Sequence, residues 1–157
     1  MRENESKVIV RRYEYEEPYH IQLEFIISNG KFSSTVDIYC TVDDVRKIGE
    51  SLFVFPKKMN DEYSFVYGSE NPEDNFDKFF SLKAYTVDGS GHCALQFKVN
   101  LNEVAPSEGK SVFSLLAETS EINRLGKLFI TFSKLKHKEF QWSGNRGELF
   151  EEHQYIY

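Results

Sequence analysis

The sequence is poor in cysteine and lacks the short motifs that mark common catalytic, cofactor and metal sites. Its 157 residues contain only Cys40 and Cys93, which show neither CxxC spacing nor the spacing of a disulfide framework. No HExxH, GxSxG or GxGxxG pattern occurs, and structural zinc sites normally show close ligand pairs. We therefore expect no cofactor and no metal, and we assign no catalytic residue. Enzymes can scatter their catalytic residues, so the missing motifs argue against an enzyme without excluding one.

Long apolar runs and an excess of positive charge are also missing. No run approaches the length of about 20 residues that a membrane-spanning helix needs, and the N-terminal residues form no apolar signal core. The 19 Lys and Arg residues are outnumbered by 25 Asp and Glu residues, which gives a formal net charge of −6. This balance argues against nucleic-acid binding, which usually needs a basic stripe. We expect a reduced, cytoplasmic protein without membrane contact, whose acidic charge suits a basic protein partner.

What the chain does contain is enough apolar sequence for one domain, which we expect to span residues 1–157. A chain of this size buries about 68–70% of its unfolded surface, so it needs no disulfide or metal to stay folded. Aromatic residues make up 15% of the sequence, with 14 Phe and 9 Tyr. Such residues favour strands and also supply anchors at protein interfaces.

Two segments of the chain match each other at a constant offset. The stretch Asp44–Lys57 lies over Glu121–Lys134 without a gap, and it places Gly49 on Gly126, an offset of 77 residues (126 − 49). Internal similarity dictates architecture when it is real. We therefore hypothesise a tandem strand-strand-helix duplication with pseudo-two-fold symmetry, its two copies spanning about residues 20–67 and 92–142.

Apolar residues with a helical period predict two helices, near residues 42–55 and 119–134. Alternating apolar residues predict strands in most of the remaining chain, with Leu23, Phe25, Leu95 and Phe97 in the core. The expected fold is α+β, with an antiparallel sheet packed against the two helices. The helical residues expected to be buried are Val45, Ile48, Leu52, Phe53, Ile122, Leu125, Phe129 and Ile130.

The strongest site candidate is the segment Asp61–Asp77, which combines six acids and four aromatics with no Lys or Arg. An acidic loop beside aromatic residues can steer and then anchor a basic partner. In this hypothesis the aromatic anchors are Tyr67 and Phe76, and the steering acids are Glu70, Glu73, Asp74 and Asp77. The alternative interpretation is a solvated surface loop without a partner.

A second hypothesis is an enzyme or small-molecule-binding protein with a cleft near His20, Ser90 and His92. The two histidines begin similar strands, and the stretch Asp88–His92 places a serine between glycines. That stretch lacks the strand–turn–helix setting of a nucleophile elbow, and Asp-Gly between strands is a common hairpin turn. The turn is therefore the favoured interpretation of Asp88–His92.

The chain resembles a group of small, largely uncharacterised bacterial proteins at Val42–Gly49, Ala84–Leu95 and Ile122–Lys127. The likeness covers most of residues 20–142 in order and spacing. The layout of the group is similar to that of immunity proteins in polymorphic toxin systems, which are short, acidic and rich in strands. The resemblance implies a protein-binding inhibitor, and it supplies no binding or catalytic residues that could be carried over to this chain.

Overall fold

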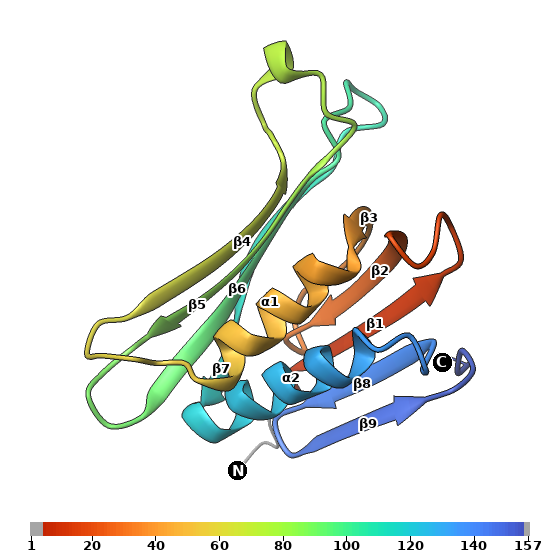
Figure 1. Ribbon diagram of the computed structural model, residues 1–157. Coiled ribbons are helices and arrows are strands. Elements are labelled where there is room, and N and C mark those ends of the chain that lie inside the picture. Colours follow the sequence, from red (N-terminus) through yellow and green to blue (C-terminus); the bar gives the residue numbers. More distant parts are fainter. Residues whose placement is uncertain (1–4, 156–157) are drawn as a thin grey trace.

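The computed structural model describes residues 5–155 and shows an α+β fold with two helices and two antiparallel sheets (Figure 1). One sheet has five strands in the order β3-β2-β1-β8-β9, and the other has four in the order β4-β5-β6-β7. The predicted fold class is confirmed, although the strands form two sheets. The elements are β1 (Lys7–Tyr13), β2 (His20–Ser28), β3 (Ser33–Thr41), α1 (Val42–Phe53), β4 (Glu62–Gly68), η1 (Pro72–Asp74), β5 (Phe79–Thr86), β6 (His92–Asn100), β7 (Lys110–Glu118), α2 (Thr119–Phe132), β8 (Glu139–Ser143) and β9 (Arg146–Phe150).

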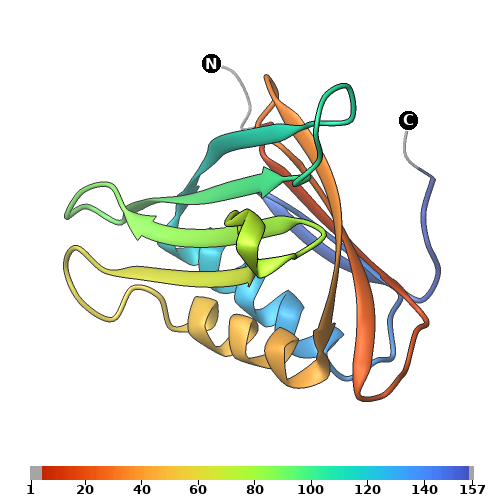
Figure 2. The same cartoon turned by 90° about the horizontal axis from the view of Figure 1, so that it is seen from above.

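The core lies between the inner faces of the two sheets and the helices. Seen from above, the sheets meet at an angle, and the helices lie on the open side of that angle (Figure 2). Burial alternates along β2 as its sequence predicts, because successive side chains of a strand point to opposite faces. The rings of Phe25 and Phe80 join the two sheets, with centroids 4.6 Å apart. The four predicted core residues of the strands are all fully buried: Leu23, Phe25, Leu95 and Phe97.

The two halves of the chain use the same order of elements. β7, α2 and β8 begin 77 residues after β3, α1 and β4 respectively (110 − 33, 119 − 42 and 139 − 62). Three consecutive strands form the body of each sheet: β1 to β3 in one and β5 to β7 in the other. Each half also contributes one strand to the sheet of the other half. β4, which follows α1, pairs with β5, and β8, which follows α2, pairs with β1. In the part of the chain that the structure describes, β9 has no counterpart in the four-stranded sheet. A common origin of the halves stays a prediction.

Each helix begins directly at the end of a strand. Thr41 caps α1: its hydroxyl accepts from the Asp44 N–H at 3.0 Å, and the Asp44 carboxylate accepts from the Thr41 N–H at 2.9 Å. In α2 the cap position belongs to Glu118, whose N–H donates to the Glu121 carboxylate at 2.7 Å. Within residues 5–155, neither helix is long and apolar enough to cross a membrane.

The two helices pack against each other, antiparallel, through the glycines that the sequence match aligned. A Cβ added at Gly49 would lie 2.7 Å from the Ile130 nitrogen, and one added at Gly126 would lie 2.3 Å from the Phe53 nitrogen. The two contacts are equivalent in the two halves, because Gly126 follows Gly49 by 77 residues and Ile130 follows Phe53 by the same number (130 − 53). Close approach of the helix backbones is therefore the reason that each helix carries a glycine, which costs about 1 kcal/mol against alanine.

The predicted burial is wrong for the last apolar residue of each helical pattern, Phe53 in α1 and Ile130 in α2. Phe53 is 49% exposed, and Ile130 is only partly buried. Both residues lie where the helix backbones cross: the Phe53 nitrogen lies against Gly126, and the nitrogen and side chain of Ile130 lie against Gly49. Phe55, which follows the end of α1, turns into the core in place of Phe53 and is 2% exposed.

Candidate functional site

The predicted partner-binding residues lie at the tip of the long β4–β5 hairpin, which projects away from the helices (Figure 1). The short helix η1 forms this tip, and the Asn71 side chain caps it by accepting from the Glu73 N–H at 3.1 Å. Asn75 ends the turn in the left-handed conformation with φ 54°, which asparagine tolerates better than most residues. We call residues 69–77 the acidic tip.

Hydrogen bonds from a neighbouring loop hold the acidic tip in one shape. The Asn102 amide donates to the carbonyl oxygens of Ser69 at 2.8 Å and of Phe76 at 3.2 Å. Within the tip, the Ser69 hydroxyl donates to the Asp74 carboxylate at 2.6 Å. The tip is therefore an ordered structure, and little of its conformational entropy remains to be lost on binding.

The two predicted aromatic anchors lie together at the base of the tip. The rings of Tyr67 and Phe76 meet edge to face with centroids 6.4 Å apart, and Phe76 is 48% exposed. The Tyr67 hydroxyl donates to the Asp77 carboxylate at 3.5 Å. Burial raises the pKa of Tyr67, and the Asp77 charge adds to that shift. Phe76 thus offers an exposed apolar surface on a fixed support.

The structure separates Glu70 from the other acids of the predicted site. The Glu70 carboxylate accepts from Asn100 at 3.0 Å and forms ion pairs with Lys98 at 2.7 Å and Lys110 at 3.5 Å. The hydrogen bonds from Asn100 and Lys98 lower the pKa of Glu70 to about 2. Its charge is therefore balanced within the protein and contributes little to the attraction of a partner.

The other three acids carry charge that nothing nearby balances. Glu73, Asp74 and Asp77 are exposed, and none of them forms an ion pair within residues 5–155. The nearest cation along the chain, Lys78, is paired with Asp37 at 2.9 Å. The acidic tip therefore presents one exposed phenylalanine together with three exposed carboxylates that form no ion pair with any described residue.

Replacement of Glu70 by glutamine is expected to lower stability by up to about 1 kcal/mol near neutral pH, because partly exposed ion pairs contribute little. The folded-state pKa of Glu70 is depressed, so its contribution is present above the unfolded-state pKa of about 4.3. It is lost as the pH falls toward the folded value of about 2. Urea unfolding near pH 7 and near pH 2 tests this expectation. A stability difference that is the same at both pH values would contradict it.

The residues of the alternative cleft do not meet. His20 pairs with Thr41 beside the start of α1, and His92 pairs with Glu118 beside the start of α2. Because the helices are antiparallel, these starts lie at opposite ends of the helix pair. His20 lines a depression of about 680 Å³ with Ile130, whereas His92 lines a separate one of about 260 Å³ with Glu118.

His92 and Ser90 belong to the predicted hairpin turn. The Asp88 carboxylate accepts from the Ser90 N–H at 2.8 Å and lies 2.7 Å from Nδ1 of His92. This hydrogen bond raises the pKa of His92, and the Glu118 carboxylate adds to the shift. The Ser90 side chain is exposed, and the carboxylate of Asp88 organises the turn rather than a nucleophile.

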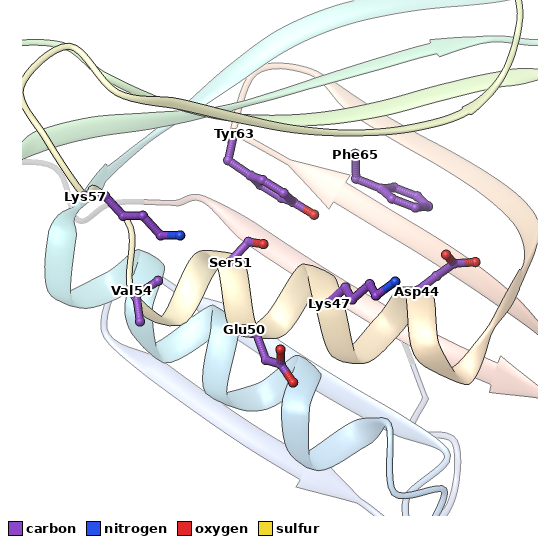
Figure 3. Close-up of a pocket in the computed structure, with 8 residues that line it drawn as sticks. All are labelled: Asp44, Lys47, Glu50, Ser51, Val54, Lys57, Tyr63 and Phe65. Carbon is purple, nitrogen blue, oxygen red and sulfur yellow. The ribbon is translucent and has the colours of Figure 1, made fainter.

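A groove between α1 and β4 is a second candidate site, one that sequence reasoning missed. Its volume is about 560 Å³, and Figure 3 shows the rings of Tyr63 and Phe65 side by side above Ser51 and Lys47 of the helix. Burial raises the pKa of Tyr63. The sequence match could have pointed to this groove, because β4 follows α1 at the same offset of 77 residues at which β8 follows α2. The residues that line the groove are Asp44, Lys47, Glu50, Ser51, Val54, Lys57, Tyr63 and Phe65.

Comparisons with known proteins found little similarity. No protein-family model matches the sequence, and no curated protein matches it. Among solved structures, one described as the plant transcriptional regulator PBF-2 is similar, with a TM-score of 0.46 and 10% identity. The match covers 82% of this chain and 75% of that chain, and its similarity is too low to bear on function.

Proposed function

We propose that this protein is a non-enzymatic, cytoplasmic binding module, an immunity or inhibitor protein that covers a basic surface on a toxin or effector. The observation that carries the proposal is the acidic tip, which combines an exposed Phe76 with the exposed acids Glu73, Asp74 and Asp77. The resemblance of the sequence to a group with the layout of immunity proteins supports the same function.

The physics of association assigns separate roles to the two kinds of side chain. Uncompensated carboxylates attract a basic surface from a distance and raise the association rate. An aromatic side chain that is half exposed loses its remaining water contact on binding and slows dissociation. Because hydrogen bonds from Asn102 already order the tip, association does not have to order the loop as well.

Capture of a partner from the native host, or with the product of the neighbouring gene, tests the proposal. The test variant carries Glu73→Gln, Asp74→Asn and Asp77→Asn. We expect it to recover about tenfold less partner than the wild type at low ionic strength, because screening is weakest there. Its folding is checked by thermal unfolding.

The matched control removes the same charge elsewhere, with Glu14→Gln and Glu16→Gln in the exposed loop between β1 and β2 and Glu151→Gln just after β9. It should capture as much partner as the wild type. Equal losses in both variants would show that net charge alone matters. Undiminished capture by the tip variant would show that the partner binds another surface, and either result would overturn the proposed role of the tip.

A further inference from the structure

Among residues 5–155, no strand lies beside the outer edge of β4. β4 is the first strand of the four-stranded sheet, and the Thr86 N–H donates to the Asp61 carbonyl at 3.3 Å just before β4 begins. Antiparallel pairing alternates between hydrogen-bonded and non-hydrogen-bonded residue pairs. The backbone groups of Ser64 and Val66 therefore point away from β5, and no described residue bonds to them. Such an edge is a template for another strand.

The other sheet shows what occupies the equivalent edge. β8 begins 77 residues after β4 (139 − 62), and β9 pairs antiparallel with its outer edge. Four residues that line the groove beside β4 have counterparts at the same offset beside β8. These pairs are Lys47 and Arg124, Ser51 and Leu128, Tyr63 and Phe140, and Phe65 and Trp142.

β9 contacts these counterparts in α2 and β8. A Cβ added at Gly147 would lie 3.1 Å from Leu128 and 3.3 Å from Arg124, so the strand passes directly over α2 at this point. Leu149, opposite Phe140, is partly buried against the core. A glycine over the helix and an apolar residue two positions later thus describe a strand that fits such a groove.

We propose that the groove between α1 and β4 binds an extended peptide segment of a partner protein, which adds to the sheet as an antiparallel fifth strand. Its backbone bonds to Ser64 and Val66, as in other cases of strand addition. A small residue passes over the helix at Ser51, and an apolar side chain packs against the ring of Tyr63. This proposal goes beyond the function assigned to the acidic tip and uses different residues.

Charge on the groove adds one further requirement to the segment. Lys47 is paired with Asp43 at 2.9 Å and Glu50 with Arg46 at 3.6 Å along the helix. The Lys57 ammonium reaches over the groove (Figure 3) and forms no ion pair in the part of the chain that the structure describes. An acidic side chain on the bound segment complements it.

A peptide fits this edge better than a second copy of the chain. In two-fold pairing of β4 with its copy, the inward-facing residues of the added strand would be Tyr63, Phe65 and Tyr67, whereas β9 has Gly147 where it passes over the helix. A separate peptide segment can carry a small residue at that position. Self-association through β4 is nevertheless a distinct outcome of the test below.

The test is selection from a phage-displayed library of random peptides about twelve residues long, which covers the usual length of strands. Affinities of synthetic copies are then measured for the full chain, for Ser64→Pro and for Ser64→Ala. Proline removes the outward N–H of an edge strand without breaking the pairing with β5, whereas alanine keeps it. A third variant, Ser51→Trp, fills the groove from the helix and replaces the proline variant if that one fails to fold.

We expect selected peptides that contain a small residue followed two positions later by an apolar one. Their dissociation constants should rise tenfold or more in Ser64→Pro and Ser51→Trp, and stay within about twofold in Ser64→Ala. Bound peptide should protect the Ser64 and Val66 amides from hydrogen exchange. The proposal is overturned if no peptide is selected, if the first two variants bind as well as wild type, or if the chain self-associates through β4.

Discussion

Replacement of Gly126 by alanine is expected to lower the free energy of unfolding by about 3 kcal/mol. The new Cβ would lie 2.3 Å from the Phe53 nitrogen and 2.7 Å from the Gly49 oxygen, both of them backbone atoms that cannot rotate away. Overpacking usually costs about 1–3 kcal/mol and occasionally more. Alanine returns only about 1 kcal/mol through its higher helix propensity. The helices must therefore move apart, and urea unfolding measures the loss.

Gly89→Ala is the matched control for this substitution. Gly89 lies in the exposed β5–β6 turn, and an added Cβ would meet only the Met59 side chain at 3.9 Å. Its stability should stay within about 0.5 kcal/mol of the wild type, as is usual for surface changes. If Gly126→Ala were as stable as Gly89→Ala, the close crossing of α1 and α2 would be wrong.

Phe129→Ala is expected to cost about 3–5 kcal/mol, the range for a large aromatic side chain removed from a core. Phe129 is fully buried, and its ring lies 5.0 Å from that of Phe140 and 6.4 Å from that of Phe25. The cavity would therefore open between α2 and the five-stranded sheet. Thermal and urea unfolding give the difference.

Phe53→Ala distinguishes the burial seen in the structure from the burial that the helical period predicts. The pattern places Phe53 in the core, but its side chain is 49% exposed in the structure. Its removal should cost no more than about 1 kcal/mol, because little apolar area is lost from the core. Equal losses for Phe53→Ala and Phe129→Ala would contradict the observed burial.

The sequence predicts the local elements well because their causes are local. The 3.6-residue period of the helices and the alternation along the strands both act over a few residues. Gly49 and Gly126 are also informative, because a glycine on an apolar helical face has a cost that only close packing explains. The contact between the helix backbones supplies that packing reason.

The number of sheets and the edges of the core could not be predicted in the same way. Alternation shows that a strand has one buried face, but it does not say which strand lies beside it. The pairing of Arg11 in β1 with Glu139 in β8 joins distant parts of the chain, and this pairing completes the five-stranded sheet. Phe53 is exposed because another helix crosses there, which its own neighbours in sequence cannot show.

In the candidate site, too, the features with local causes could be predicted from the sequence and those that depend on distant residues could not. Composition located the acidic segment and the exposed Phe76, but it grouped Glu70 with the free acids. The partners of Glu70 are Lys98 on β6 and Lys110 on β7, which only the sheet brings to it. His20 and His92 were grouped by their similar strands, and the antiparallel helices place them at opposite ends.

The association rate constant with the captured partner, measured by stopped flow at low and at physiological ionic strength, tests the central claim most directly. We predict that the variant with Glu73→Gln, Asp74→Asn and Asp77→Asn associates about tenfold more slowly at low ionic strength, and that the difference shrinks as salt screens the charges. Glu70→Gln should associate like the wild type, and Phe76→Ala should mainly speed dissociation. A tip variant that associates as fast as the wild type at low ionic strength, or a Glu70→Gln variant that alone is slowed, would contradict the account.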